Sequence, residues 1–553
     1  MKYLFSIIIL FSFQDYLEAQ SSWYRTNRII EQRVDQIDIQ DTIVHDLHTS
    51  IKPYYREDVL AMSVGHNSSS SNYIKTDNYF ADEQIKETGF WNHFYKSPAH
   101  FLEFSSEDFK ISINPIIHFS TGRTSDDTDL IFQNTRGLEL YGSLDNKIYF
   151  SSSVFENQRH FLNHIDKRIA RDKAIPGNGF FKLYTSGISD NIFGWDYLNA
   201  QGYVGFNISK SVSLEFGHGK HFIGNGYHSL LLDNYGHNYF YLKFNTRFWK
   251  FHYQNIFAEL SIFGSEDNIS NTLLPKKYMA AHFLDINLTN NFSIGIYEAI
   301  IFNRENHFEF NYLNPIILYR SVEQFLDSPD NVLIGLNFKW NIYNRIQAYS
   351  QILIDELVIG ELTNNNGWWG NKYGIQLGLK YMSIAGIENL DGQLEYNLVR
   401  PYTYAHQDTI EGLGERAIAS YSHYNQPLAH ALGSNFSEFL WRLRYQIGPK
   451  FTAETVVFFT TYGEDINGLN YGGNILKTYE TRITDYDNST GQGNKQNIRQ
   501  LKFELSYQLF HNGFIDIDYF HRSEKFENLD NNRQSNYIGL GFRMNIARQR
   551  LDY

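Results

Sequence analysis

The sequence predicts an all-β protein, a transmembrane outer-membrane β-barrel of about 18 antiparallel strands behind a short N-terminal periplasmic segment. Three observations predict this class: an apolar leader, strands with an apolar residue at every second position, and connections that alternate between short and long. The prediction divides the chain into a signal peptide at 1–19, a periplasmic segment with room for a helix at 20–107, and the barrel at 108–553.

Composition narrows the class of protein before any motif is considered. Of the 553 residues, 17% are aromatic, with 40 Tyr and 44 Phe, and such side chains suit half-buried strands and membrane interfaces. A charged fraction of 20% is too high for a helical membrane protein. The chain has no cysteine, which excludes a disulfide scaffold, a thiolate metal site and a lipid-modified N-terminal cysteine. A net charge of −13 argues against a nucleic-acid partner, since phosphate binding requires a basic surface.

The first residues have the order of an export signal. Met1 and Lys2 supply a positive end, residues 3–13 are mostly apolar, and residues 17–19 offer a cleavage site before Gln20. The apolar run is shorter than the roughly 20 residues of a membrane-spanning helix, and no later run reaches about 18. A secreted chain of this kind that enters a membrane would cross it as strands.

Strand patterns with a period of two recur along the chain. In residues 439–447 every other side chain is apolar, with Arg442, Arg444 and Gln446 between them. Residues 501–509, 515–519 and 538–546 repeat the pattern. A soluble β-sandwich would alternate in the same way, so the period alone leaves both folds open.

Connection lengths separate the two folds. Short turns are centred near 145–146, 209–210, 248–249, 289–290, 342–343, 389, 448–449 and 512–513. Longer connections run at 121–133, 157–197, 220–237, 260–278, 301–330, 355–372, 400–436, 461–498 and 522–534. Eight short turns and nine long connections require 18 strands. Short periplasmic turns opposite long outside loops are typical of barrels in the outer membrane, which is the predicted location, with lipid around the wall.

Four segments carry more specific expectations. Residues 29–47 mix charged and apolar side chains and could form a short helix, so the periplasmic segment either plugs the barrel or remains an uncommitted tail. The polar run 67–71 is expected to be flexible. Residues 180–186 could be a further strand but would break the even count, so they are assigned to a loop. The alternation of 538–546 lapses before Tyr553, so the last strand either ends early or contains a bulge.

Four motifs resemble the Wzi capsule-assembly family. They are the glycine-punctuated stretch 219–232, Asn314-Pro315, the stretch 367–374 with its Trp-Trp pair, and Arg400-Pro401-Tyr402-Thr403-Tyr404. The resemblance points to a RemB-like branch associated with gliding motility. It covers residues 200–450 by motif and the rest of the chain by architecture.

The resemblance implies an outer-membrane barrel that binds capsular polysaccharide on its outer surface, as a lectin rather than as an export channel. It also implies an N-terminal helical portion that closes the periplasmic end, for which residues 29–47 are the matching stretch. For the RemB-like branch, the bound object could also be exopolysaccharide slime or a surface adhesin.

Side chains suited to sugar recognition gather in two of the long connections. Aromatic faces can lie under the apolar C–H faces of sugar rings, while planar amides, carboxylates and Arg exchange hydrogen bonds with hydroxyls. The candidate polysaccharide-binding residues are Trp368, Trp369, Arg400, Tyr402, Tyr404, His406, Tyr421, His423, Tyr424 and Gln426. The alternative is that these aromatics pack the loops together over the barrel mouth or lie in the interface belt.

The glycine-rich connection is expected to have a structural role. Gly219, Gly224 and Gly226 permit tight turns and close approach of the backbone, so this loop can fold inward and bury residues 230–232. A phosphate-binding loop is a poor fit, because Lys220 precedes the glycines instead of following them.

No catalytic or metal site is predicted. The adjacent carboxylates at 355–356 point to opposite faces of a strand and cannot flank one bond. The pairs His218/His221 and His423/His430 lack a third ligand. Three functional hypotheses remain: a non-catalytic barrel that organises surface polysaccharide without a cofactor, a diffusion porin, or a component of gliding or adhesion machinery with a protein partner.

Overall fold

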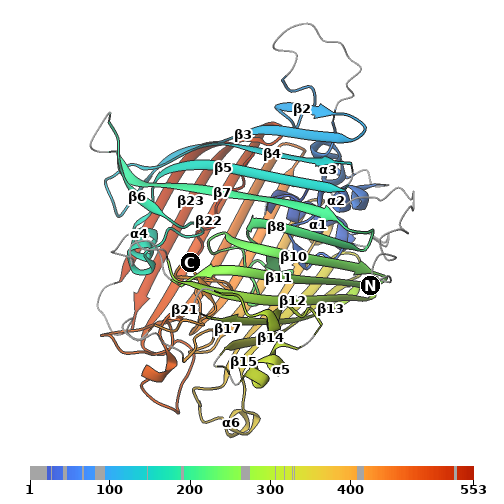
Figure 1. Cartoon of the computed structure of the whole chain (residues 1–553). Helices are drawn as coiled ribbons and strands as arrows, with labels where there is room; N and C mark the ends of the chain where they lie inside the picture. The colour runs from blue at the N-terminus through green and yellow to red at the C-terminus, as the bar shows by residue number, and fades with distance from the viewer. Residues whose placement is uncertain are drawn as a thin grey trace, which may run out of the picture.

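The strands of the chain form one closed barrel, with helices inside the wall and around its rim (Figure 1). The computed structural model describes residues 22–25, 28–40, 47–64, 68–80, 94–145, 147–187, 192–262, 274–304, 307–316, 318–326, 328, 330–407, 416–527 and 532–553. The predicted signal peptide at 1–19 lies outside these residues.

The helices are α1 (Arg28–Gln40), α2 (Arg56–Ser63), α3 (Ser69–Asp77), α4 (Asn163–Asp172), α5 (Tyr319–Leu326) and α6 (Ile359–Asn364), with 3-10 turns η3 (Phe310–Leu313), η4 (Ile384–Gly386) and η5 (Tyr479–Thr481). The wall strands are β3 (Phe109–Thr124), β4 (Ile131–Leu144), β5 (Ile148–His160), β7 (Phe193–Asn207), β8 (Val212–Gly219), β10 (Tyr239–Phe248), β11 (Phe251–Ser261), β12 (Lys276–Thr289), β13 (Phe292–Phe302), β14 (Asn331–Ile342), β15 (Ile346–Glu356), β16 (Lys372–Tyr381), β17 (Leu390–Val399), β20 (Phe436–Ile447), β21 (Phe451–Glu464), β22 (Asn494–Phe510), β23 (Gly513–Phe526) and β24 (Arg533–Met544). Short strands are β1 (Ile51–Lys52), β2 (Leu102–Ser105), β6 (Phe181–Thr185), β9 (Phe222–Ile223), β18 (Ser422–His423) and β19 (Gln426–Pro427).

Eighteen antiparallel strands close the barrel, which confirms the predicted fold class and strand count. Wall strands pair in chain order, and β24 pairs with β3 to close the ring. The assignment of residues 180–186 to a loop was wrong in part, because β6 forms there. It pairs with the part of β7 that β8 does not reach, so it covers an open strand edge without changing the number of wall strands.

Short turns and long loops lie at opposite ends of the barrel, as the connection lengths predicted. Several short turns contain a residue with a positive φ, including Trp249, Asn389 and Asn512, because tight hairpins need that backbone conformation. By the general pattern of outer-membrane barrels, the short turns face the periplasm and the long loops face the outside.

The outer face of the wall is apolar. Side chains such as Leu138, Leu198, Ile296, Leu377 and Ile517 are exposed on it, while their strand neighbours point into the lumen. A closed wall with an apolar outer face is the structure that a bilayer requires, so the chain is an outer-membrane barrel. Among the helices in the described ranges, none is long and apolar enough to cross a membrane.

Helices α1, α2 and α3 form a plug inside the short-turn end of the barrel (Figure 1). They share a small core that includes Val34, Val59 and Ile74. The expected helix over 29–47 is α1, which ends at Gln40, and residues 41–46 lie outside the described residues. The run 67–71 was expected to be flexible; residue 67 lies outside the described residues, and Ser68 caps α3 by accepting a hydrogen bond from the Ser71 amide at 3.1 Å.

Carboxylates anchor the plug to the wall. Asp77 at the end of α3 accepts hydrogen bonds of 2.9 Å from His511 and from Asn512, both in a short turn. Burial alone would raise the pKa of Asp77, but the His511 hydrogen bond and the Arg56 charge hold it well below its usual range. Asp38 of α1 pairs with the wall lysine Lys339 at 3.2 Å. These contacts hold the plug in place through groups that would otherwise be unpaired in the lumen.

Residues 545–553 leave the wall and run through the lumen. The last strand ends early at Met544, which decides between the two predicted alternatives. Arg548 pairs with Asp516 at 2.8 Å, and Lys502 pairs with Asp552 at 2.7 Å, so charges on β22 and β23 hold this segment. We call residues 545–553 the lumenal tail.

A lysine at Ile517, on the lipid-facing side of β23, should destabilise the barrel. The expected loss is about 2–4 kcal/mol if the position lies near the bilayer centre, because the ammonium group would be placed in hydrocarbon. Urea unfolding in lipid vesicles measures it, with Thr363→Lys on the exposed α6 as the matched control. Equal stability of the two variants would contradict the assignment of Ile517 to the lipid face.

Candidate functional site

The loop between β8 and β10 folds from the outside rim into the lumen and meets the plug. Its strand β9 pairs with β1, so that Ile223 lies opposite Ile51. The Gly224 amide donates to the Ser50 carbonyl at 2.7 Å. This inward loop, residues 220–237, therefore connects the outer end of the barrel to the periplasmic plug.

Wall residues hold the backbone of the inward loop. The Gln351 amide donates to the Ile223 carbonyl at 2.9 Å and accepts from the Leu230 amide at 2.8 Å. Gly224 has a φ of 135°, and an added Cβ would lie 2.3 Å from the Gln351 side chain. Glycine is required there both by the backbone conformation and by the close approach of the wall.

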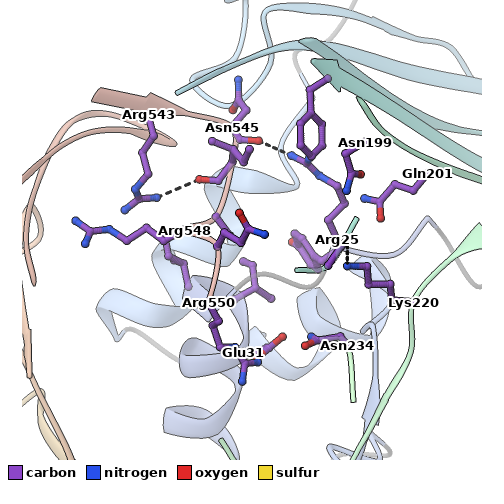
Figure 2. A pocket seen from close by; sticks show the side chains of 18 of the residues that line it. Arg25, Glu31, Asn199, Gln201, Lys220, Asn234, Arg543, Asn545, Arg548 and Arg550 are labelled. Atoms are coloured by element: carbon purple, nitrogen blue, oxygen red, sulfur yellow. Dashed lines mark hydrogen bonds between the residues drawn. The ribbon is translucent and has the colours of Figure 1, made fainter. Parts of the chain in front are cut away.

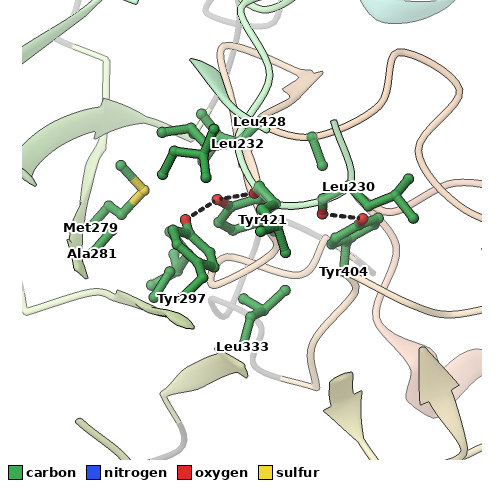
Figure 3. Close-up of a cluster of buried hydrophobic side chains, with 14 of the residues drawn as sticks. Leu230, Leu232, Met279, Ala281, Tyr297, Leu333, Tyr404, Tyr421 and Leu428 are labelled. Atoms are coloured by element: carbon green, nitrogen blue, oxygen red, sulfur yellow. Dashed lines mark hydrogen bonds between the residues drawn. The ribbon is translucent and has the colours of Figure 1, made fainter. Parts of the chain in front are cut away.

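A chain of tyrosine hydroxyls also supports the inward loop (Figure 3). Tyr421 donates to the Leu231 carbonyl at 2.7 Å and accepts from the Tyr297 hydroxyl at 2.6 Å. Tyr404 donates to the Leu230 carbonyl, also at 2.7 Å. These leucines and tyrosines are fully buried, and they belong to an apolar core in the lumen.

Loops 357–371, 400–435 and 465–493 cover the outer mouth of the barrel, and we call them the cap; residues 408–415 within it lie outside the described residues. Most of the predicted polysaccharide-binding residues are buried in it: Tyr402, Tyr404, His406, Tyr421, His423, Tyr424 and Gln426. These buried side chains are not accessible to a ligand in this structure. Their positions fit the alternative prediction, in which they pack the loops together.

Polar atoms of these buried side chains bond to the surrounding backbone. His423 accepts from the Ser261 amide at 2.9 Å and donates to the Asn238 carbonyl at 3.0 Å. Burial lowers the pKa of His423 to about 3, so the ring is neutral at ordinary pH. Gln426 accepts from the Gly177 amide at 2.8 Å. The sequence shows which residue types gather in this loop but not that the loop turns them inward.

The two predicted tryptophans remain partly exposed on the cap. The Arg482 guanidinium lies 4.1 Å from the centre of the Trp369 ring, and Arg400 donates to the Trp368 carbonyl at 3.1 Å. The Trp369 amide donates to the Asp485 carbonyl at 2.9 Å, so the backbone at the exposed Tyr486 lies next to the tryptophan segment. We call Trp368, Trp369, Arg482 and Tyr486 the tryptophan surface.

Two members of the tryptophan surface were missed by sequence reasoning. Arg482 and Tyr486 belong to the 465–493 loop, which was recognised only as a long connection. Tyr471, Tyr479 and Tyr486 give that loop an aromatic spacing that could have identified it. The contact of this loop with residues 357–371 could not be predicted from the sequence.

A chamber of about 250 Å³ lies among the plug, the inward loop and the lumenal tail (Figure 2). Basic, amide, carboxylate and aromatic side chains all line it, and they include Arg25, Glu31, Asn199, Gln201, Lys220, Asn234, Arg543, Asn545, Arg548 and Arg550. Lys220 donates to the Gly177 carbonyl at 2.8 Å, and burial lowers the pKa of this amine to about 8.

His228, His430 and Glu438 come close enough to suggest a metal site, but their hydrogen bonds indicate otherwise. One ligand atom from each lies within 4.8 Å of the others. The Leu432 amide donates to His430 Nδ1 at 3.2 Å, so the neutral ring carries its proton on Nε2, which lies 3.1 Å from Glu438. A nitrogen that donates this proton is not available to a metal ion.

Comparison with solved structures shows an outer-membrane barrel fold. No family model matches the chain, and no curated protein matches it. Wzi of Escherichia coli, a carbohydrate-binding β-barrel of the outer membrane involved in group 1 capsule assembly, is similar with a TM-score of 0.57 and 12% identity, over 95% of this chain and 100% of Wzi. The outer membrane protein OprD of Pseudomonas aeruginosa has a TM-score of 0.42 and 10% identity, over 78% and 95% of the two chains. OccAB2 of Acinetobacter baumannii has a TM-score of 0.42 and 9% identity, over 79% and 97%. The expected likeness to a Wzi-type barrel is confirmed at the level of the fold.

Replacing Tyr421 with Phe should destabilise the cap and the inward loop together. The variant loses the bond to the Leu231 carbonyl and leaves the Tyr297 hydroxyl without its acceptor, a cost of about 1–3 kcal/mol. Thermal unfolding in detergent measures this, and Tyr486→Phe at the exposed cap surface is the control. A melting temperature unchanged from the parent chain would argue that the hydroxyl chain does not support the loop.

Replacing Gly224 with Val should displace the inward loop and open a path through the barrel. In planar bilayers the parent chain is expected to show no steady conductance, and the variant to show open events. Gly360→Val is the matched control, because nothing lies within 4 Å of a Cβ added at that position. Steady conductance of the parent chain would instead support the porin hypothesis.

Proposed function

We propose that the protein is a non-catalytic outer-membrane barrel that binds and organises surface polysaccharide, either capsule or exopolysaccharide, through its extracellular cap. The observation that carries this proposal is the combination of a filled lumen with aromatic and polar side chains left exposed on the cap. A barrel filled by a plug, an inward loop and a lumenal tail is poorly suited to diffusion.

The tryptophan surface has the chemistry that sugar recognition needs. Trp368 provides an apolar face for the C–H face of a sugar ring, and Tyr486 adds a further exposed aromatic side chain. The Trp369 ring packs against Arg482 and Tyr479, so it contributes only the part of its ring that stays exposed. Arg482 donates from Nε to Asp485 at 2.7 Å and from Nη1 to the Tyr479 carbonyl at 3.2 Å, and its remaining N–H groups can donate to hydroxyls or to a uronate carboxylate. Of the ten residues expected to bind polysaccharide, the proposal keeps these two tryptophans as the contacts and gives Arg400 the role of positioning them.

The long, repetitive nature of a surface polysaccharide fits weak individual contacts. A polymer that spans several copies of the protein binds each next copy at a high effective concentration, so avidity exceeds the affinity of one surface. Shallow binding on the cap would therefore be enough to hold a polymer layer at the cell surface.

A second candidate function is a component of gliding or adhesion machinery with a surface adhesin as its partner. It is favoured by the apolar side chains of Val358, Ile359 and Leu362, which are exposed at and around α6 on the cap. Sugar binding does not require such a group, whereas a protein partner could bury it. Site-specific crosslinking from Ile359 in intact cells would distinguish this candidate from the first.

Replacing Trp368 or Tyr486 with Ala should weaken binding of the folded protein to the cell's own surface polysaccharide. Loss of one aromatic contact costs about 1–2 kcal/mol, or roughly 5–30-fold in affinity. Trp249→Ala is the control, because this tryptophan is exposed in a short turn at the opposite end of the barrel. Binding that is absent, or equal in all variants, would count against the tryptophan surface.

A further inference from the structure

The connection between β13 and β14 lies against the outside of the barrel wall. Its elements η3 and α5 pack with outward-facing side chains of β11 to β14, and this shared core includes Phe257, Ala280, Ile300 and Val332. Figure 1 shows α5 beside β14, outside the ring. We call residues 307–326 the outer flap; residue 317 within it lies outside the described residues.

Strand alternation establishes that the flap covers the lipid-facing side. Tyr297 and Ala299 of β13 belong to the lumenal core, so Glu298 between them points outward. On β12 the lumenal core includes Ala281 and Phe283, so His282 points outward as well. The flap therefore packs on the face of the wall that contacts lipid elsewhere in the barrel.

Under the flap, the wall carries a row of polar side chains. Asn255, His282 and Glu298 are cross-strand neighbours on β11, β12 and β13, and all three are buried. His282 lies 2.9 Å from Glu298. A charged or polar row in the middle of a lipid-facing wall is costly unless it is covered and paired, and the flap supplies the cover.

Glu298 anchors the flap. Its carboxylate accepts hydrogen bonds from the amides of Tyr319 at 3.0 Å and Arg320 at 3.1 Å, which are the first two residues of α5. The Tyr319 ring stacks on His282 with 4.5 Å between ring centres. At the rim of the barrel, Arg304 pairs with Asp330 at 2.6 Å and closes the base of the flap.

Two backbone groups at the Asn314-Pro315 motif have partners, as contact with hydrocarbon requires. The Ile316 amide donates to the Asn314 side chain at 3.1 Å. Pro315 has no N–H group, and its carbonyl accepts a hydrogen bond from Tyr253, two residues from the periplasmic start of β11. The Asn314-Pro315 motif thus places the flap deep along the wall rather than at its outer rim.

The exposed residues of the flap include four large apolar side chains, together with His307, Asn311, Asn314, Arg320 and Gln324. Phe310, Ile316, Leu318 and Phe325 are exposed by 79%, 85%, 62% and 84%. They continue the apolar belt of the wall, where Ile296 of β13 and Ile334 of β14 are exposed. The cation of Arg320 pairs with Glu323 on the same helix at 2.6 Å.

We propose that the outer flap is embedded in the outer membrane and that its four apolar side chains contact the acyl chains of the surrounding lipid. We infer lipid as the partner of these side chains because they lie within the apolar belt of the wall. The same hydrocarbon layer surrounds the wall on both sides of the flap. The buried polar row under the flap is then shielded from that layer. This proposal holds whether or not the cap binds polysaccharide.

The absence of cysteine allows a direct test, because one introduced thiol can be labelled without further changes. A bimane fluorophore is attached to Phe325→Cys and the full chain is folded into phosphatidylcholine vesicles. Quenching is measured with nitroxide-labelled acyl chains and with aqueous iodide. Leu540→Cys on the lipid belt and Thr363→Cys on the cap are the matched lipid and water controls.

The expected result is a loss of fluorescence with nitroxide lipid similar to that at Leu540→Cys, and little loss with iodide. Quenching by iodide as strong as at Thr363→Cys would overturn the proposal and place the flap in water. If neither quencher acts on Phe325→Cys, another copy of the protein covers the flap, and lipid contact is again excluded.

Discussion

A ring of 18 strands is too wide for the side chains of its own wall to fill, and this constraint shapes the interior. The lumenal side of the wall carries charged and amide side chains that need partners once water is displaced. Lys243 and Glu215 are both buried and pair at 2.7 Å, and Trp23 beside the plug donates to Glu215 at 3.0 Å. The plug, the inward loop and the lumenal tail each fill space and complete such hydrogen bonds.

The same requirement explains the cap. Tyr297, Tyr404 and Tyr421 each combine a large apolar ring with a hydroxyl, so they fill the lumen and still make hydrogen bonds. Tyr404 and Tyr421 donate to carbonyls of the inward loop, and Tyr297 donates to the Tyr421 hydroxyl. Aromatic side chains that look like a ligand surface in the sequence are largely used for this internal support. What remains outside is the small tryptophan surface, held by backbone hydrogen bonds between two loops.

Much of the fold could be predicted from the sequence because its determinants are local. The alternation of 439–447 and the turn at 512–513 depend on neighbouring residues, and together they give strand number and orientation. The candidate site depends on contacts between distant segments, so it could be predicted only in part. Trp368 was identified, but Arg482 lies more than a hundred residues away in sequence. The outer flap could not be predicted for the same reason, since the alternation around Glu298 does not indicate that another segment covers this residue.

The lumenal tail has a consequence for the assembly of the barrel. It follows directly from β24, the strand that joins β3 at the seam of the barrel. Because Arg548 and Asp552 bond to inward-facing groups on β22 and β23, the tail reaches its partners only on the inner side of the wall. A ring that closed without its tail would leave the carboxylates of Asp516 and Asp518 facing an empty lumen, so the barrel is complete only when its interior is filled.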